Sequence, residues 1–125
     1  MKKIFYWSPC LNRVGTLYST INSAISVKKY SNDTFEPIII NSCGEWDDYL
    51  KVFNKHNIKV ENFYRHNYFR FLPKQGFINS RLSYLIIYIF SFIPLLKLVQ
   101  KNRNEILISH LITSLPLSLL LIFNI

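Results

Sequence analysis

The chain has 125 residues, of which half are hydrophobic and only 18% are charged, so it is long enough for one domain and too apolar for a disordered protein. Lysine and arginine outnumber aspartate and glutamate by 15 to 7, and the formal charge of +8 suits an anionic partner: a phosphoryl ligand, an acidic lipid surface or nucleic acid. Cys10 and Cys43 form no C-x-x-C pair and have no histidines at ligand spacing, so we expect reduced thiols in the cytoplasm and no metal site.

The N-terminal third has the pattern of a β-α-β unit. The short aromatic and β-branched run Ile4–Trp7 predicts a buried strand that ends at Ser8-Pro9. An amphipathic helix is predicted next, with Thr16 as its N-cap, because apolar residues recur at helical spacing: Leu17, Ile21, Ala24 and Ile25. The run Pro37–Ile40 is apolar without alternation, which is typical of a parallel strand covered on both faces.

A second helix and an edge strand are predicted next. The helix is indicated by aromatic and aliphatic residues at one face, between Trp46 and Phe53, with acidic residues in its first turn and Lys55 in its last. The segment Ile58–Glu61 alternates between apolar and charged residues, so the third strand is expected toward an edge of the sheet.

The remaining segments predict a helix, a strand and a last helix. The first helix carries Tyr84–Leu96, with Asn79 or Ser80 as its cap and a kink or break at Pro94. A fourth strand, Glu105–Ser109, precedes an apolar helix at 117–123.

The alternation of strands and helices predicts an α/β fold with a Rossmann-like open parallel sheet, occupying residues 1–125 as one domain. The last predicted helix has neither a basic final turn nor a glycine cap, so we expect the sheet to be incomplete at the C-terminus.

In such sheets ligands bind beyond the carboxyl ends of the strands, which makes three residues in the loops there candidates for a site. Gly15 directly precedes a predicted helix, where backbone N–H groups meet phosphates or sugar hydroxyls, but it is also an ordinary turn residue. Glu45 either faces a ligand or simply leads into the next helix. His110 follows the fourth strand, so it either faces the crevice or is structural.

The order of these segments resembles the N-terminal domain of GT-B glycosyltransferases of family 4, which assemble bacterial surface polysaccharides. The segments that carry the resemblance are Ile4–Pro9, Gly15-Thr16, Asn41–Trp46 and Glu105–Pro116. The stretch from Glu105 is similar to the family's Asp-Val-Val-His-x-His pattern, with Glu105 in the acidic place and His110 in the place of the final histidine.

The resemblance implies the acceptor-side half of a hexosyltransferase, which transfers a sugar from a nucleotide-sugar to a lipid-linked or glycan acceptor. It implies a catalytic role for His110 beside the reacting sugar and acceptor binding near Gly15, Thr16 and Glu45. The nucleotide-sugar is a substrate, and a retaining transfer of this kind needs no metal or other cofactor. Since the family's second, donor-binding domain does not follow in this sequence, we expect an inactive fragment.

Basic residues near the third predicted helix suggest that this part of the chain binds a membrane surface. We expect Arg65, Arg70, Lys74 and Arg81 to meet anionic headgroups at the inner face of the membrane, although a solvated basic loop beside a buried helix remains the alternative. The uncharged stretch between Arg81 and Lys97 is only about 22 Å of helix, which is short for a span. The alternative function is a small membrane protein with two apolar helices and a basic cytoplasmic head that acts by interaction. No nucleic-acid motif accompanies the basic residues, so no such partner is expected.

Overall fold

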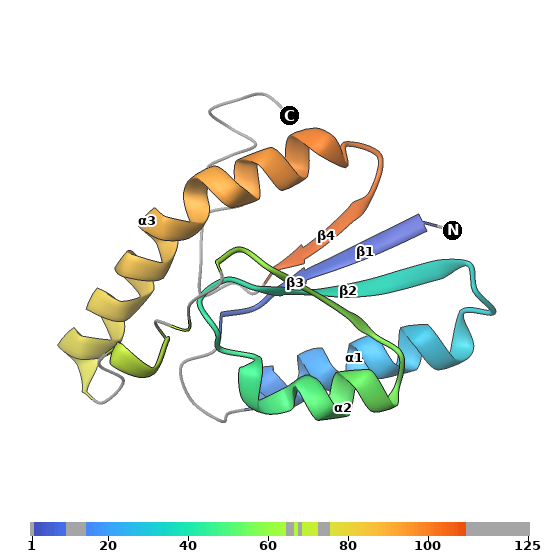
Figure 1. Cartoon of the computed structure of the whole chain (residues 1–125), viewed down its shortest axis with the longest axis horizontal. Helices are drawn as coiled ribbons and strands as arrows, with labels where there is room; N and C mark the ends of the chain where they lie inside the picture. The colour runs from blue at the N-terminus through green and yellow to red at the C-terminus, as the bar shows by residue number, and fades with distance from the viewer. Residues whose placement is uncertain (1, 10–14, 65–66, 68, 73–75, 110–125) are drawn as a thin grey trace.

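The chain folds around a four-stranded sheet in which all strands are parallel, in the order β3-β2-β1-β4 (Figure 1). The structure, a computed structural model, describes residues 2–9, 15–64, 67, 69–72 and 76–109. The strands are β1 (Lys2–Trp7), β2 (Phe35–Asn41), β3 (Lys59–Asn62) and β4 (Ile106–Ser109). The helices are α1 (Gly15–Tyr30), α2 (Leu50–Lys55) and α3 (Phe77–Lys101), with 3₁₀ turns η1 (Asp47–Tyr49) and η2 (Phe69–Phe71).

This architecture confirms the predicted α/β fold with a Rossmann-like open parallel sheet. It also bears on the alternative of two membrane helices with a basic head. That reading needed an apolar helix beginning near Ile106, but Ile106–Ser109 is a strand in register with Ile4–Trp7. The last predicted helix, at 117–123, lies outside the described residues.

The sheet is covered on both faces, and successive residues of the central strands serve opposite faces. Ile4 and Tyr6 of β1 pack with α1 and α2, whereas Phe5 and Trp7 pack with Leu95 and other residues of α3. Figure 1 shows α1 and α2 on one side of the sheet and α3 on the other. Two-sided burial explains why the Pro37–Ile40 run is apolar without alternation.

β3 lies at an edge of the sheet, as its alternating sequence predicted. Its residues are mostly exposed, and Lys59 on this strand forms a 2.7 Å salt bridge with Glu36 of β2. The hydrogen bond from Lys59 holds the pKa of the Glu36 carboxyl below its usual value. Charged side chains on a short edge strand discourage pairing with other chains.

Two predicted helix starts are wrong. α1 begins at Gly15, so Thr16 is its second residue and not its N-cap. α3 begins at Phe77 after Gly76, so Asn79 and Ser80 lie inside its first turn rather than before it. Gly76 has a φ of 86°, a conformation that glycine adopts without strain, and this turn sets the start of the helix ahead of either polar residue.

The helix predicted around Trp46 and Phe53 is divided into the 3₁₀ turn η1 and the short α-helix α2. A 3₁₀ turn brings residues three apart into line. Trp46 and Tyr49 are three apart, and their rings meet edge to face with centroids 6.0 Å apart. Ring packing in the core therefore accompanies the tighter turn.

The sequence predicted a kink or a break at Pro94. α3 continues through Pro94 as one helix of 25 residues, so the break is wrong, whereas the bend of its axis in Figure 1 agrees with a kink. Proline has no N–H, so the carbonyl of Phe90, four residues earlier, lacks its helical donor. The hydroxyl of Tyr64 donates a hydrogen bond to this carbonyl. Tyr64, in the loop after β3, thus supplies a hydrogen-bond donor for the carbonyl that Pro94 cannot pair.

Candidate functional site

Because all four strands are parallel, the carboxyl ends of β1, β2, β3 and β4 lie at the same end of the sheet. This is the end at which parallel sheets bind their ligands. After β1 the chain moves outward to β2 and β3 and then returns to place β4 on the other side of β1. This reversal puts the topological switch point between β1 and β4. The loops that follow these two strands, 10–14 and the segment from 110, lie outside the described residues.

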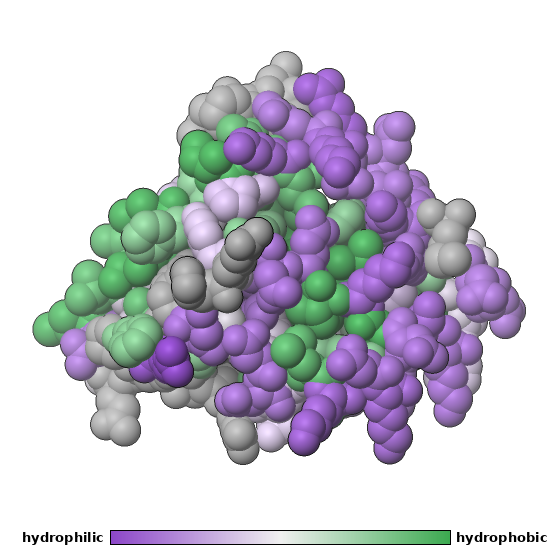
Figure 2. All heavy atoms as spheres, in the orientation of Figure 1, coloured by the Kyte–Doolittle hydropathy of each residue, from purple (hydrophilic) through white to green (hydrophobic). Residues whose placement is uncertain are grey.

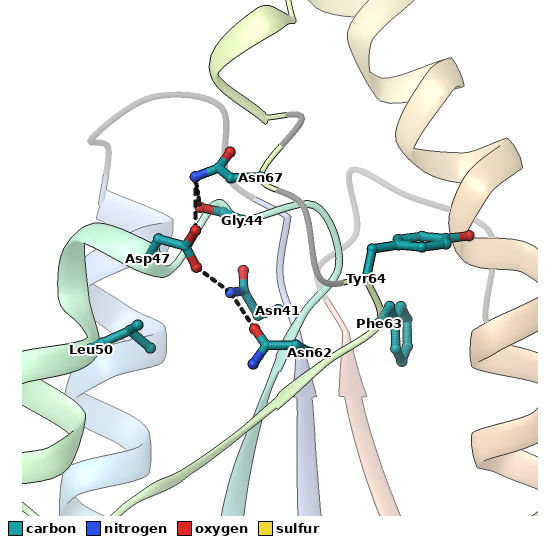
Figure 3. A pocket seen from close by; sticks show the side chains of 8 residues that line it. All are labelled: Asn41, Gly44, Asp47, Leu50, Asn62, Phe63, Tyr64 and Asn67. Carbon is teal, nitrogen blue, oxygen red and sulfur yellow. Dashed lines mark hydrogen bonds between the residues drawn. The ribbon is translucent and has the colours of Figure 1, made fainter.

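A pocket of about 620 Å³ lies at the same edge, at the ends of β2 and β3 (Figure 3). The side chains that line it come from the ends of the two strands, the loop after β2, η1, α2 and the segment after β3: Asn41, Gly44, Asp47, Leu50, Asn62, Phe63, Tyr64 and Asn67. Three of the eight are asparagines and one is an aspartate. The lining therefore offers amide and carboxylate groups to a polar ligand.

Asn41 is the centre of a hydrogen-bond network in this pocket. Its amide nitrogen donates to Asp47 Oδ1 at 2.7 Å and to Asn62 Oδ1 at 2.8 Å. Its amide oxygen accepts the backbone N–H of Trp46 at 3.1 Å. Asn41 is buried, so every one of its polar atoms that is left without a partner would cost stability.

Asn67 closes the network from the opposite side, as Figure 3 shows. Its amide nitrogen donates to Asp47 Oδ2 at 2.8 Å, and its amide oxygen accepts the backbone N–H of Arg70. It also lies against Gly44, whose φ is 96°. A Cβ at Gly44 would come within 2.4 Å of Asn67 Cγ, so this close approach requires glycine.

The loop after β2 is held from within by Glu45, which is buried. Its two carboxylate oxygens accept the backbone N–H groups of Ser42 at 3.0 Å and Cys43 at 2.8 Å, and the Cys43 thiol lies 3.1 Å from one of them. The loop is also tied to β1, because Trp7 Nε1 donates to Ser42 Oγ at 2.8 Å. These contacts fix the backbone that carries Gly44 and Asp47.

Burial raises the pKa of the Glu45 carboxyl above its ordinary value of 4.5, although the N–H groups of Cys43 and Ser42 oppose this shift. Burial likewise raises the pKa of the Cys43 thiol, with Glu45 adding to the effect. The thiol therefore remains protonated and is not a thiolate nucleophile.

The raised pKa of Glu45 predicts a specific dependence of stability on pH. The folded state holds the proton more tightly than the unfolded chain, so this stabilising contribution is complete below about pH 4.5 and is lost as the pH rises through the folded-state pKa. We expect urea unfolding to show a fall in the free energy of unfolding as the pH rises above about 4.5 that is smaller in Glu45→Gln. An identical pH dependence in both proteins would contradict an elevated pKa.

The sequence-predicted site residues do not gather in this pocket. Neither Gly15, which is exposed at the start of α1, nor Glu45 is among the lining residues. Arg70 and Arg81 are exposed, on η2 and α3 respectively. His110, Arg65 and Lys74 lie outside the described residues, as does the side chain of Thr16, so the roles assigned to them stay predictions.

The four polar residues of the network, Asn41, Asp47, Asn62 and Asn67, were not singled out from the sequence. For Asn41 and Asn62 a signal existed, since each is the last residue of its strand at the carboxyl edge. Nothing in the sequence indicates that Asn67, which is 20 positions from Asp47, donates to that carboxylate.

The arrangement suits recognition of hydroxyl-rich molecules. A carboxylate accepts several hydrogen bonds, and a side-chain amide both donates and accepts, as a sugar hydroxyl also does. Among the described residues, no group of three or more His, Cys, Asp and Glu side chains gathers as metal ligands would. No family model, no curated protein and no solved structure matches this chain, so the fold and the pocket are the basis for assigning a function.

Proposed function

We propose that this chain is the acceptor-side domain of a GT-B glycosyltransferase of the family 4 type, acting in polysaccharide biosynthesis. The observation that carries the proposal is the network of asparagines around Asp47, in a pocket at the carboxyl edge of a parallel sheet. The strand order 3-2-1-4 supports it, because the same order begins the doubly wound nucleotide-binding sheets.

In this proposal the pocket holds hydroxyls of a lipid-linked or glycan acceptor. Asp47 accepts hydrogen bonds from them, and the Asn62 amide, which is exposed and lines the pocket, donates to them. By resemblance, His110 contacts the reacting sugar, and Gly15, Thr16 and Glu45 belong to the acceptor side. The nucleotide-sugar donor is held mainly by a second Rossmann-like domain, and the reaction requires groups from both domains around one centre.

Carbohydrate binding tests the proposal. We expect ¹H–¹⁵N spectra of the chain, titrated with oligosaccharides, to show shifts of the side-chain amide signals of Asn41, Asn62 and Asn67. Asn62→Ala removes an exposed side chain that accepts one hydrogen bond from Asn41, so the fold is retained. Its affinity should fall roughly fivefold to tenfold, the effect of one hydrogen bond.

Asn54→Ala is the matched control, since Asn54 is an exposed asparagine on α2 that does not line the pocket. Binding by this variant should equal that of the original chain. Saccharide titrations that leave the pocket amides unshifted would exclude the acceptor role. Sugar transfer from nucleotide-hexoses by the isolated 125 residues would contradict the need for a second domain.

A further inference from the structure

α3 has two apolar faces, of which one is turned outward. Its inner face is buried and contributes Ile87, Leu95 and Leu98 to the core, together with two buried polar residues, Ser83 and Ser91. On the outer side, large apolar side chains are each exposed by about half or more, at spacings of three and four residues: Ile78, Leu82, Leu85, Ile89 and Ile93. This spacing places them in one stripe along the helix, which we call the outer stripe.

The outer stripe forms a hydrophobic region on the surface of the domain. Figure 2 shows hydrophobic side chains gathered over α3 at the left of the molecule, while hydrophilic side chains cover most of the right-hand part. Phe90 of α3 and Phe71 of η2 are further large apolar side chains at the surface, with 51% and 75% of their surfaces exposed. Single exposed apolar residues are common, but a contiguous patch of this kind marks a binding surface.

The charges on α3 itself have one sign. α3 contains no aspartate or glutamate, while Arg81 near its start and Lys97 and Lys101 near its end are exposed. Arg70 and Arg103, also exposed, lie just before and after the helix in the chain, and the Arg70 guanidinium is 5.0 Å from the centre of the Phe71 ring. An apolar stripe bordered by cations fits an anionic bilayer surface.

We propose that the outer stripe of α3 docks this domain on the surface of an anionic lipid bilayer, with the helix lying in the plane of the membrane. The Ile and Leu side chains of the stripe enter the boundary between headgroups and acyl chains, and the lysines at the end of the helix meet lipid phosphates. This deepens the predicted membrane-surface role of Arg70 and Arg81 by naming the apolar residues that insert.

A membrane-spanning helix and a coiled-coil seam are two other possible uses of the stripe, and both agree less well with the structure. Arg81–Lys101 is long and apolar enough to cross a membrane. However, Leu95 and Leu98 pack against Phe5 and Trp7, so a spanning α3 would leave the sheet or carry it into the bilayer. In a coiled-coil seam, flanking positions commonly carry acidic and basic residues together, whereas every charge on α3 is positive.

Sedimentation with lipid vesicles tests the proposal on the whole 125-residue chain. We expect binding to vesicles of phosphatidylcholine containing one-third phosphatidylglycerol and much weaker binding to phosphatidylcholine alone. Leu85→Gln/Ile89→Gln should abolish most binding to both. Lys97→Gln/Lys101→Gln should weaken binding to the anionic vesicles roughly tenfold to thirtyfold, as expected for two basic residues at an anionic surface.

Matched controls lie on the opposite side of the sheet. Tyr18→Gln changes a half-exposed aromatic residue of α1, and Lys51→Gln/Lys55→Gln removes two exposed lysines of α2. Both should bind vesicles as the original chain does, and circular dichroism should show the same fold in all variants.

Undiminished binding by Leu85→Gln/Ile89→Gln would overturn the proposal. The proposal would also fail if the chain self-associated without binding vesicles and Leu85→Gln/Ile89→Gln made it monomeric. The stripe would then contact a second copy of the chain. Resistance to alkaline carbonate extraction from membranes would instead favour a spanning helix. No sugar is involved in these measurements, so their outcome is separate from that of the acceptor-binding test.

Discussion

Phe53→Ala is expected to lower the free energy of unfolding by about 3–5 kcal/mol, the range for removing a buried aromatic side chain. Phe53 is fully buried in the core between the sheet and the helices α1 and α2. Its ring meets the Trp46 ring edge to face at 5.7 Å, and this aromatic pair is lost together with the buried area. Urea unfolding followed by far-UV circular dichroism measures the loss.

The effect should be specific to the inward face of α2. Lys51→Ala, an exposed change on the same helix, should alter stability by no more than about 0.5 kcal/mol. A loss below about 1 kcal/mol for Phe53→Ala would show that α2 does not pack on the sheet as described, because the cavity term alone exceeds that value.

Asn41→Leu is expected to destabilise the domain by about 3 kcal/mol, since leaving buried polar groups unpaired costs about 1–3 kcal/mol each. Leucine has a similar volume but removes the acceptor for the Trp46 N–H and the donor to Asp47. The backbone of the loop after β2 then loses one of the contacts that fix it, the bond from the Trp46 N–H to Asn41. The same urea titration reports the change.

Asn62→Leu is the control for Asn41→Leu, because it makes the same substitution at an exposed position of the network. Asn62 is exposed and accepts one hydrogen bond from Asn41. Its replacement should cost less than about 1 kcal/mol. Equal losses at the two positions would mean that Asn41 does not have the central role that its contacts indicate.

The sheet was predictable because its signals are local. The uninterrupted apolar run at Pro37–Ile40 indicates burial on both faces, and the alternation at Ile58–Glu61 indicates an edge strand. Each pattern spans a single strand and depends on which faces are covered, so one sequence is enough to read it.

The pocket was less predictable because it depends on contacts between distant segments. Asn67 reaches Asp47 across 20 positions, and Tyr64 reaches Phe90 across 26. The second contact also accounts for the unbroken α3. The sequence shows Pro94, but it does not show that the Tyr64 hydroxyl donates to the Phe90 carbonyl, which lacks its helical donor. Glu45 was noticed as a polar residue at the right edge, but its carboxylate is engaged by the backbone of its own loop.

The central position of β1 has a consequence for synthesis of the protein. β1 pairs with β4, and the backbone N–H of Lys3 donates to Glu105 at 2.6 Å across 102 positions, so the sheet is incomplete until the ribosome has released the strand at Ile106–Ser109. α3 emerges before that strand. Leu95 and Leu98 on its inner face therefore lack the part of their packing surface that Leu107 of β4 provides until that strand has also been made.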